Sequence, residues 1–120
     1  MNRRDRGRDG EDAAWEYLRR RGYRLRERNL RTRLGEIDLV VERGETIVFV
    51  EVRSRRGARF GTAFESVGPR KRERIARLAA QYLARERLEG RRARFDVVAV
   101  EWQDAGPNVD HLENAFEVPE

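Results

Sequence analysis

Hydrophobic and polar residues alternate along residues 35 to 55, in two runs around a short Glu-Arg-Gly-Glu connection. A period of two is typical of β-strands, and two such runs joined by a connection that contains glycine indicate a β-hairpin. The turn is expected to be centred on Arg43 and Gly44. The pairing of the two strands then follows from the length of this turn.

An even loop is required, because an odd one would place Asp38 beside Val48 and destroy the apolar face of the hairpin. The even loop pairs Glu36 with Glu51 and places Asp38 diagonally across from Glu51. It also pairs Asp38 with Phe49. The apolar face then carries Ile37, Leu39, Val41, Val48, Val50 and Val52. The opposite face mixes acidic and apolar residues, namely Glu36, Asp38, Val40, Ile47, Phe49, Glu51 and Arg53.

The three carboxylates on the mixed face call for a physical explanation, because like charges across a sheet are destabilising. Carboxylates beside apolar side chains are costly to bury unless a cation lies among them, and a divalent metal suits oxygen ligands. One interpretation is therefore a metal site. The other is an ordinary hairpin with a solvated polar face, in which Arg53 neutralises Glu36 or Glu51.

Two segments have the apolar spacing of helices. Residues 9–21 form the first, which Gly22 ends, and Glu11 is expected in its first turn. An acid there is also explained without chemistry, because it complements the positive end of the helix dipole. The second helix is expected at residues 69–89, from the proline at its start to Gly90.

The remaining segments complete a sheet. Residues 19–33 suggest a strand followed by a loop, residues 54–68 a loop that Phe60 and Phe64 anchor beside the acidic face, and residues 94–102 a further strand. Residues 109–118 add a final strand or an extended tail. The order helix, three strands, helix, strand predicts an α/β domain with a mixed sheet, whose second helix crosses one sheet face.

Residues 19–33 contain eight arginines and one glutamate, the densest positive charge in the chain. Phosphate backbones are the commonest partner of such a surface, since each neutralised phosphate releases counterions. The alternative is a solvated edge strand, whose charges protect it from aggregation. The predicted nucleic-acid contacts are Arg24, Arg26, Arg28, Arg31 and Arg33, with Arg55 and Arg56 from the loop after the hairpin.

Composition narrows the class of protein. The 120 residues fit a single domain over 1–120, with residues 1–8 and 117–120 expected as flexible tails. Cysteine is absent, which excludes disulfides and thiolate metal sites. No apolar run approaches the roughly 18 residues of a membrane span, and the charged N-terminus has no signal peptide. A soluble cytoplasmic protein without a membrane partner is expected.

Charged residues make up 41% of the chain, the net charge is +5, and Lys71 is the one lysine among 27 basic residues. If arginine has replaced lysine wherever either serves, Lys71 marks a position that needs a compact ammonium group.

The chain resembles the PD-(D/E)xK nucleases through Glu11 in the first helix, the segment GEIDLVV with Asp38, and the segment VFVEVRSR with Glu51. More narrowly, it is similar to the YraN family of endonuclease-like proteins through GEDAAWEYL, the Gly61 segment, Lys71 and RFDVVAV. The resemblance covers about residues 7 to 116. The characterised proteins most similar to that family are the archaeal Holliday-junction resolvases. The implied fold is a restriction-endonuclease-like αβββαβ core.

The resemblance implies a metal-dependent endonuclease. Asp38, Glu51 and the main-chain carbonyl of Val52 would hold Mg²⁺ or Mn²⁺, and Glu11 would complete the site. Metal would lower the pKa of a bound water and neutralise charge on the phosphate. Glu36 would orient a metal-bound water.

Arg53 departs from the nuclease motif, which has lysine at this position. Arginine does not lose its proton at any relevant pH, so Arg53 can stabilise a phosphate or position water but cannot act as a base. Lys71, at the start of the second helix, is the candidate for the missing ammonium.

Three functions therefore stay open. The first is a metal-dependent endonuclease acting on DNA, including branched or damaged DNA, by attack of metal-activated water on a phosphodiester. The second is a nucleic-acid-binding protein on a nuclease fold that does not cleave, which Arg53 favours. The third is a protein-interaction module. Nucleic acid is the expected partner, DNA ahead of RNA, and a homodimer is one alternative for the assembly.

Overall fold

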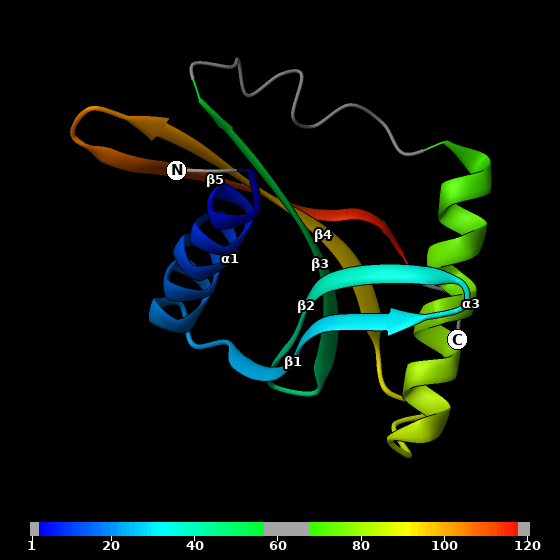
Figure 1. The fold of residues 1–120 in the computed structure, drawn as a ribbon. Coiled ribbons are helices and arrows are strands. Elements are labelled where there is room, and N and C mark those ends of the chain that lie inside the picture. The colour runs from blue at the N-terminus through cyan, green and yellow to red at the C-terminus, as the bar shows by residue number, and fades with distance from the viewer. Residues whose placement is uncertain (1–2, 57–67, 118–120) are drawn as a thin grey trace.

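The computed structural model describes residues 3–56 and 68–117, with side chains for 9–54 and 68–116. Helix α1 lies on one face of a central sheet and helix α3 on the other (Figure 1). The elements are α1 (Arg3–Arg20), β1 (Arg24–Thr32), β2 (Gly35–Arg43), β3 (Thr46–Arg56), α3 (Pro69–Arg85), β4 (Ala93–Gln103) and β5 (Gly106–Glu117). The predicted α/β domain with a mixed sheet is confirmed, and β5 is a full strand.

The five strands lie in the order β1-β2-β3-β4-β5. Neighbouring strands are antiparallel except for β3 and β4, which are parallel. A parallel pair requires a crossover, and α3 provides it, as the sequence predicts. None of the helices within the described ranges is long and apolar enough to cross a membrane.

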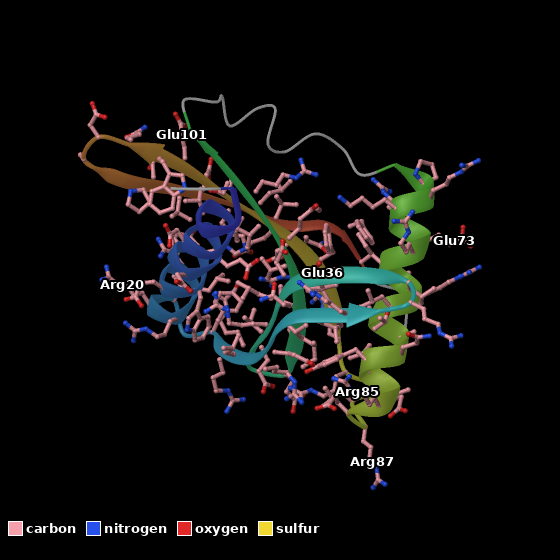
Figure 2. The ribbon with its side chains drawn as sticks, in the orientation of Figure 1. Arg20, Glu36, Glu73, Arg85, Arg87 and Glu101 are labelled. Carbon is pink, nitrogen blue, oxygen red and sulfur yellow. The ribbon has the colours of Figure 1, made fainter. Side chains whose placement is uncertain are left out.

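The hydrophobic core has two layers because both faces of β3 and β4 are covered. Phe49 and Phe95 point toward α3, and Val48 and Val98 point toward α1. This explains why β3 reads as a nearly continuous apolar run, as central strands buried on both faces do. Charged side chains extend outward instead, including Arg20 at the end of α1 and Arg85 at the end of α3 (Figure 2).

The β2–β3 hairpin has the predicted even loop, but its register is shifted by two residues. Arg43 pairs with Thr46 and Leu39 with Val50, so the turn is centred on Gly44 and Glu45. Gly44 has φ +62°, which glycine adopts without steric cost. A shift of two leaves the side chains on the same faces, because the side-chain period is also two.

Ile37 is an exception to the predicted apolar face. It packs in the cluster on the α3 side, whereas Leu39 packs on the α1 side. The pairing of β2 with β3 ends at Leu39 and Val50, and the β1–β2 hairpin curls toward α3 beyond that point (Figure 1). The alternation of the strand therefore does not carry through to Ile37.

Two helix boundaries differ from the prediction. Helix α1 begins at Arg3, so Glu11 lies in its middle and not in its first turn. The explanation of Glu11 by the helix dipole is therefore wrong. Helix α3 ends at Arg85, before Gly90, because Arg87 adopts φ +57° and Leu88 donates its N–H to the Leu83 carbonyl at 2.7 Å. This is a Schellman ending without glycine.

The predicted basic strand is present as β1, and its first residues, up to Arg20, belong to α1. The strand continues into a tight turn, since Thr32 pairs with Gly35. Most of the expected loop, with Phe60, Gly61 and Phe64, lies outside the described residues.

Candidate functional site

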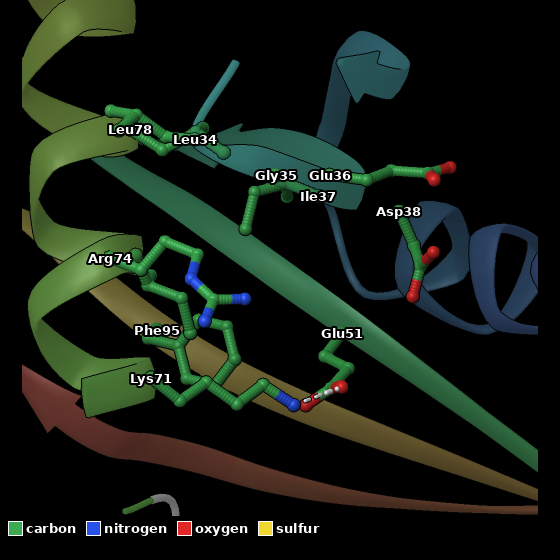
Figure 3. Close-up of a pocket in the computed structure, with 11 residues that line it drawn as sticks. Leu34, Gly35, Glu36, Ile37, Asp38, Glu51, Lys71, Arg74, Leu78 and Phe95 are labelled. Carbon is green, nitrogen blue, oxygen red and sulfur yellow. Dashed lines mark hydrogen bonds and ion pairs between the residues drawn. The ribbon is translucent and has the colours of Figure 1, made fainter. Parts of the chain in front are cut away.

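A pocket of ≈ 270 Å³ opens between β2, β3 and the start of α3 (Figure 3). Its lining is of three kinds, and the acids and the cations come from different elements. The acidic wall consists of Glu36, Asp38 and Glu51. The basic wall consists of Lys71 and Arg74. The remaining lining is apolar or glycine, namely Leu34, Gly35, Ile37, Ile75, Leu78 and Phe95.

The sheet explains why the acids meet here. Glu51 follows Phe49 by two residues on β3 and therefore points to the same side, toward α3. Asp38 lies where the β2–β3 pairing has just ended, and its Oδ2 accepts the Val52 N–H at 2.7 Å. The carboxylate of Asp38 thus replaces a main-chain acceptor at the edge of the pocket.

Asp38 is the electrostatically unusual residue of the pocket. Burial raises the pKa of Asp38 to about 6, although the hydrogen bond from Val52 opposes the rise. The negative charges of Glu11, Glu51 and Glu36 also raise this pKa. A buried carboxylate with one donor and three acidic neighbours carries negative charge that the described residues do not balance.

Glu51 is balanced by cations from two elements. Its Oε1 lies 2.7 Å from Nζ of Lys71, and its Oε2 lies 3.4 Å from a guanidinium nitrogen of Arg53. Figure 3 shows the Lys71 side chain reaching from α3 to Glu51. Lys71, singled out in the sequence because it is the one lysine, therefore lies in the same pocket as the acids.

Glu11 and Glu36 flank the pocket in different ways. Glu36 lines it and lies 3.6 Å from Arg31. Glu11 is not part of the lining; it comes from α1, and its carboxylate lies 3.6 Å from Arg28. The structure therefore brings Glu36, Asp38 and Glu51 together, while Glu11 acts on Asp38 through its charge.

The β1 arginines fall into two groups. Arg26 and Arg28 are committed to internal contacts, because Arg26 pairs with Glu42 at 3.0 Å and Arg28 with Asp12 at 2.7 Å. Arg24 and Arg31 are more open, exposing 71% and 76% of their side chains. Arg33 lies in the turn after β1 and is also exposed. The side chains of Arg55 and Arg56 lie outside the described ones.

The donor set of the pocket suits a hard divalent cation. Mg²⁺ is commonly bound through one or two carboxylates, with waters and substrate phosphates as its other ligands. Asp38 and Glu51 supply such a pair, and the raised pKa of Asp38 indicates that a cation there would relieve repulsion. Within the described ranges no three His, Cys, Asp or Glu residues form a group that could hold a metal. Asp38 and Glu51 would therefore supply only part of the ligands of a metal ion, and waters or substrate phosphates would have to supply the rest.

Arg74 is a site residue that the sequence reasoning missed. It follows Lys71 by three residues, and side chains at this spacing share a face of a helix. The signal was therefore available once Lys71 had been singled out. Arg74 forms the second cation of the basic wall.

The fold and the pocket together define an α/β domain with a restriction-endonuclease-like core, in which carboxylates from two adjacent strands face the start of a crossover helix. Residues 10–100 match the model of the family described as "Uncharacterised protein family UPF0102". The chain belongs to this family, which is the YraN family.

Its relatives match nearly from end to end. A UPF0102 protein of Moorella thermoacetica is 55% identical over 113 residues, covering 94% of this chain and 93% of the relative. A UPF0102 protein of Symbiobacterium thermophilum is 54% identical, covering 92% of this chain and 94% of the relative. A third, from Syntrophus aciditrophicus, is 46% identical, covering 93% and 88%.

Proposed function

We propose that this protein is a metal-dependent endonuclease that hydrolyses phosphodiester bonds in DNA, with branched or damaged DNA as its substrate. The observation that carries the proposal is that the carboxylates of Asp38 and Glu51 and the ammonium group of Lys71 line the same pocket. Asp38 and Glu51 stand on one wall and Lys71 on the other. The resemblance to Holliday-junction resolvases supports branched DNA as the substrate class.

The residues of the pocket have separate roles in the proposed reaction. Asp38 and Glu51 would hold Mg²⁺ or Mn²⁺, the Val52 carbonyl and Glu11 would complete the surroundings, and Glu36 would orient water. The metal, when bound, supplies a water of lowered pKa and neutralises charge on the phosphate. Lys71 then stabilises the negative charge that grows on the phosphate oxygens in the transition state.

Arg53 stabilises charge and does not accept a proton. Its guanidinium stays protonated at any relevant pH, and it lies 3.4 Å from Glu51. In the structure it shares Glu51 with Lys71, so it helps to fix the orientation of that carboxylate. The role that the motif gives to lysine thus falls to Lys71, which comes from α3.

A second function, nucleic-acid binding without cleavage, is favoured by Arg53 and by the contact between Lys71 and Glu51. Arg53 cannot take the proton of an attacking water, and Lys71 holds Glu51 at 2.7 Å, where a metal would otherwise bind. On this alternative the pocket binds a phosphate backbone and performs no hydrolysis.

Cleavage assays separate the two functions. Linear duplex, single-stranded and four-way-junction DNA are incubated with Mg²⁺ or Mn²⁺, and products are resolved by denaturing electrophoresis. We expect cleavage of the junction that Asp38→Ala abolishes. The matched control is Asp110→Ala, which removes an exposed aspartate of β5 that does not line the pocket. Binding of all three DNAs without products would establish the second function instead.

A further inference from the structure

Arg74 stands out among the cations around the pocket because its guanidinium has no counterion among the residues that the structure describes. Within the described residues Arg74 makes no hydrogen bond or ion pair, whereas Lys71 pairs with Glu51 and Arg77 pairs with Glu73 at 2.8 Å. The guanidinium nevertheless points into the pocket (Figure 3). A cation directed into a cavity without a partner is available for an anionic ligand.

The local backbone holds this arrangement. A Cβ built on Gly35 would lie 3.4 Å from Cδ of Arg74, so the stem of the arginine rests against the first residue of β2. Gly35 also has φ +141°, a conformation that side-chain-bearing residues rarely adopt. The Arg74 stem thus passes beside Gly35, while its guanidinium lies at the pocket (Figure 3).

We infer that Arg74 binds a non-bridging phosphate oxygen of the nucleic-acid backbone in this pocket, opposite Asp38 and Glu51. The inference rests on the proposed function, since it names the residue that holds the phosphate. A guanidinium presents a planar fork of N–H donors that can donate two hydrogen bonds to one phosphate group, whereas an ammonium group acts as a point charge.

The opposed charges of the two walls favour a phosphodiester over a carboxylate ligand. A carboxylate bound to Arg74 would have no further group to face a cation held by Asp38 and Glu51. A phosphodiester has two non-bridging oxygens, so one can face Arg74 while the other faces a cation held by Asp38 and Glu51. This geometry places the phosphate between the two walls.

The test measures DNA binding without cleavage. A fluorescently labelled four-way junction and a duplex are titrated in EDTA at salt concentrations from about 50 to 200 mM, and anisotropy gives the affinity. The parent's affinity is expected to fall by orders of magnitude across this range if several phosphates are contacted. Arg74→Ala should weaken binding about tenfold and reduce the salt slope by about 0.9, the contribution of one phosphate contact.

Arg77→Ala is the matched control, because it removes the same charge from the same helix outside the pocket lining. We expect it to change affinity less than about twofold and to leave the salt slope unchanged. Arg74→Lys should keep the salt slope, because the charge remains, but lose part of the affinity, because the fork is gone. Arg74→Gln, which keeps the stem against Gly35, replaces Arg74→Ala if the latter melts below the parent.

The outcomes separate the two proposals. If the parent binds DNA and Arg74→Ala behaves like Arg77→Ala, the inference about Arg74 is wrong and the proposed function stands. If the parent binds no DNA either in EDTA or with Mg²⁺ present, both fall. If Arg74→Ala loses the expected affinity but no DNA is cut, Arg74 is a phosphate ligand of a protein that binds without cleaving.

Discussion

Asp38 and Asp96 are both aspartates in the central sheet, Asp38 partly buried and Asp96 fully buried, yet their surroundings are opposite. Asp96, on β4, has 0% exposure, and both of its carboxylate oxygens are bound. Arg94 donates to both oxygens at 3.0 and 3.1 Å, His111 lies at 2.7 Å, and the Asn114 N–H donates at 2.9 Å. Asp38 has a single such contact in the described residues, from Val52 at 2.7 Å.

The pKa values follow from these partners. Burial by itself raises the pKa of Asp96, but the contacts with His111, Arg94 and the Asn114 N–H outweigh burial and hold it below its usual range. For Asp38 burial prevails, and the pKa rises to about 6. Burial therefore costs both residues, and only Asp96 is compensated by the fold.

The difference separates a carboxylate that is bound within the fold from one that is proposed to bind a metal. The Asp96 network joins distant parts of the chain, because Arg94 also donates to the Tyr23 hydroxyl at 2.6 Å and His111 belongs to β5. It has no bonding capacity left for a ligand. Asp38 retains uncompensated charge at the edge of a pocket, which is typical of residues kept for binding or catalysis.

The largest expected effect is the loss of stability when Asp96 is replaced. Asp96→Ala should lower the free energy of unfolding by about 3–5 kcal/mol, because it leaves Arg94, only 15% exposed in its side chain, without its buried counterion. Urea denaturation measures the loss. Asp110→Ala serves as the exposed control and should stay within about 0.5 kcal/mol of the parent. Equal losses for Asp96→Ala and Asp38→Ala would remove the distinction between the two residues.

A divalent metal should stabilise the folded protein only when the Asp38 carboxylate is present. At roughly a hundred times its Kd, Mg²⁺ or Mn²⁺ bound to the folded state adds about 2.7 kcal/mol, which raises the melting temperature measurably. Asp38→Asn should abolish this rise, and Asp110→Asn should retain it. If millimolar Mg²⁺ and Mn²⁺ leave the parent unchanged while Asp38→Asn lowers its melting temperature, the pocket acids are structural and the proposed function loses its basis.

Without metal, Asp38→Asn should stabilise the protein at neutral pH. An unfolded aspartate titrates near pH 4, so between about pH 4 and pH 6 the folded state binds more protons at Asp38 than the unfolded state. Stability from this carboxyl is therefore present at low pH and is lost as the pH rises through 6. Each unit of pKa difference corresponds to about 1.4 kcal/mol in the free energy of unfolding. Because Asp38 is partly exposed, we expect Asp38→Asn to stabilise the protein by about 1–2 kcal/mol.

The measurement compares urea midpoints of the parent and Asp38→Asn at pH 4 and pH 7.5. The variant should be the more stable protein at pH 7.5, and the difference should vanish near pH 4, where the parent's carboxyl is protonated. A variant less stable than the parent at pH 7.5 would contradict the assignment of Asp38 as an uncompensated charge.

The alternation of residues 35 to 55 was sufficient to predict the hairpin faces but not its register. Turns centred on Arg43–Gly44 and on Gly44–Glu45 give the same faces, so the pattern cannot distinguish between them. Ile37 was misplaced because alternation describes a continuous ladder, and the β2–β3 ladder ends at Leu39. Local patterns thus predicted the elements and failed where strands separate.

The charged sites depended on contacts between residues far apart in the sequence. Asp96 reads as a polar residue inside an apolar strand, and only the folded chain shows that Arg94 and His111 compensate it. Lys71 was singled out by its residue type, but its position opposite Glu51 depends on how α3 crosses the sheet. The acids were predictable because they lie on one hairpin, and so was the contact of Arg53 with Glu51. The contact of Lys71 with Glu51 joins two separate elements and was not.

The smallest effect on stability, and the sharpest test of the pocket, is expected from Lys71→Met. The Lys71–Glu51 pair is partly exposed, with 44% and 24% of the side chains accessible, so its loss should cost less than about 1 kcal/mol. The same substitution frees an oxygen of Glu51 and removes a positive charge beside the metal position. Mn²⁺ should therefore bind several-fold more tightly, as measured by calorimetric titration.

Arg70→Met is the matched control, because it removes a positive charge from the same helical turn but not from the pocket lining. Equal tightening in both variants would attribute the effect to net charge and not to competition for Glu51. If Lys71 stabilises the phosphate, Lys71→Met should also slow cleavage even at saturating metal. Tighter metal binding together with slower cleavage is a combination that a purely structural ion pair does not produce, because such a pair leaves the affinity for metal unchanged.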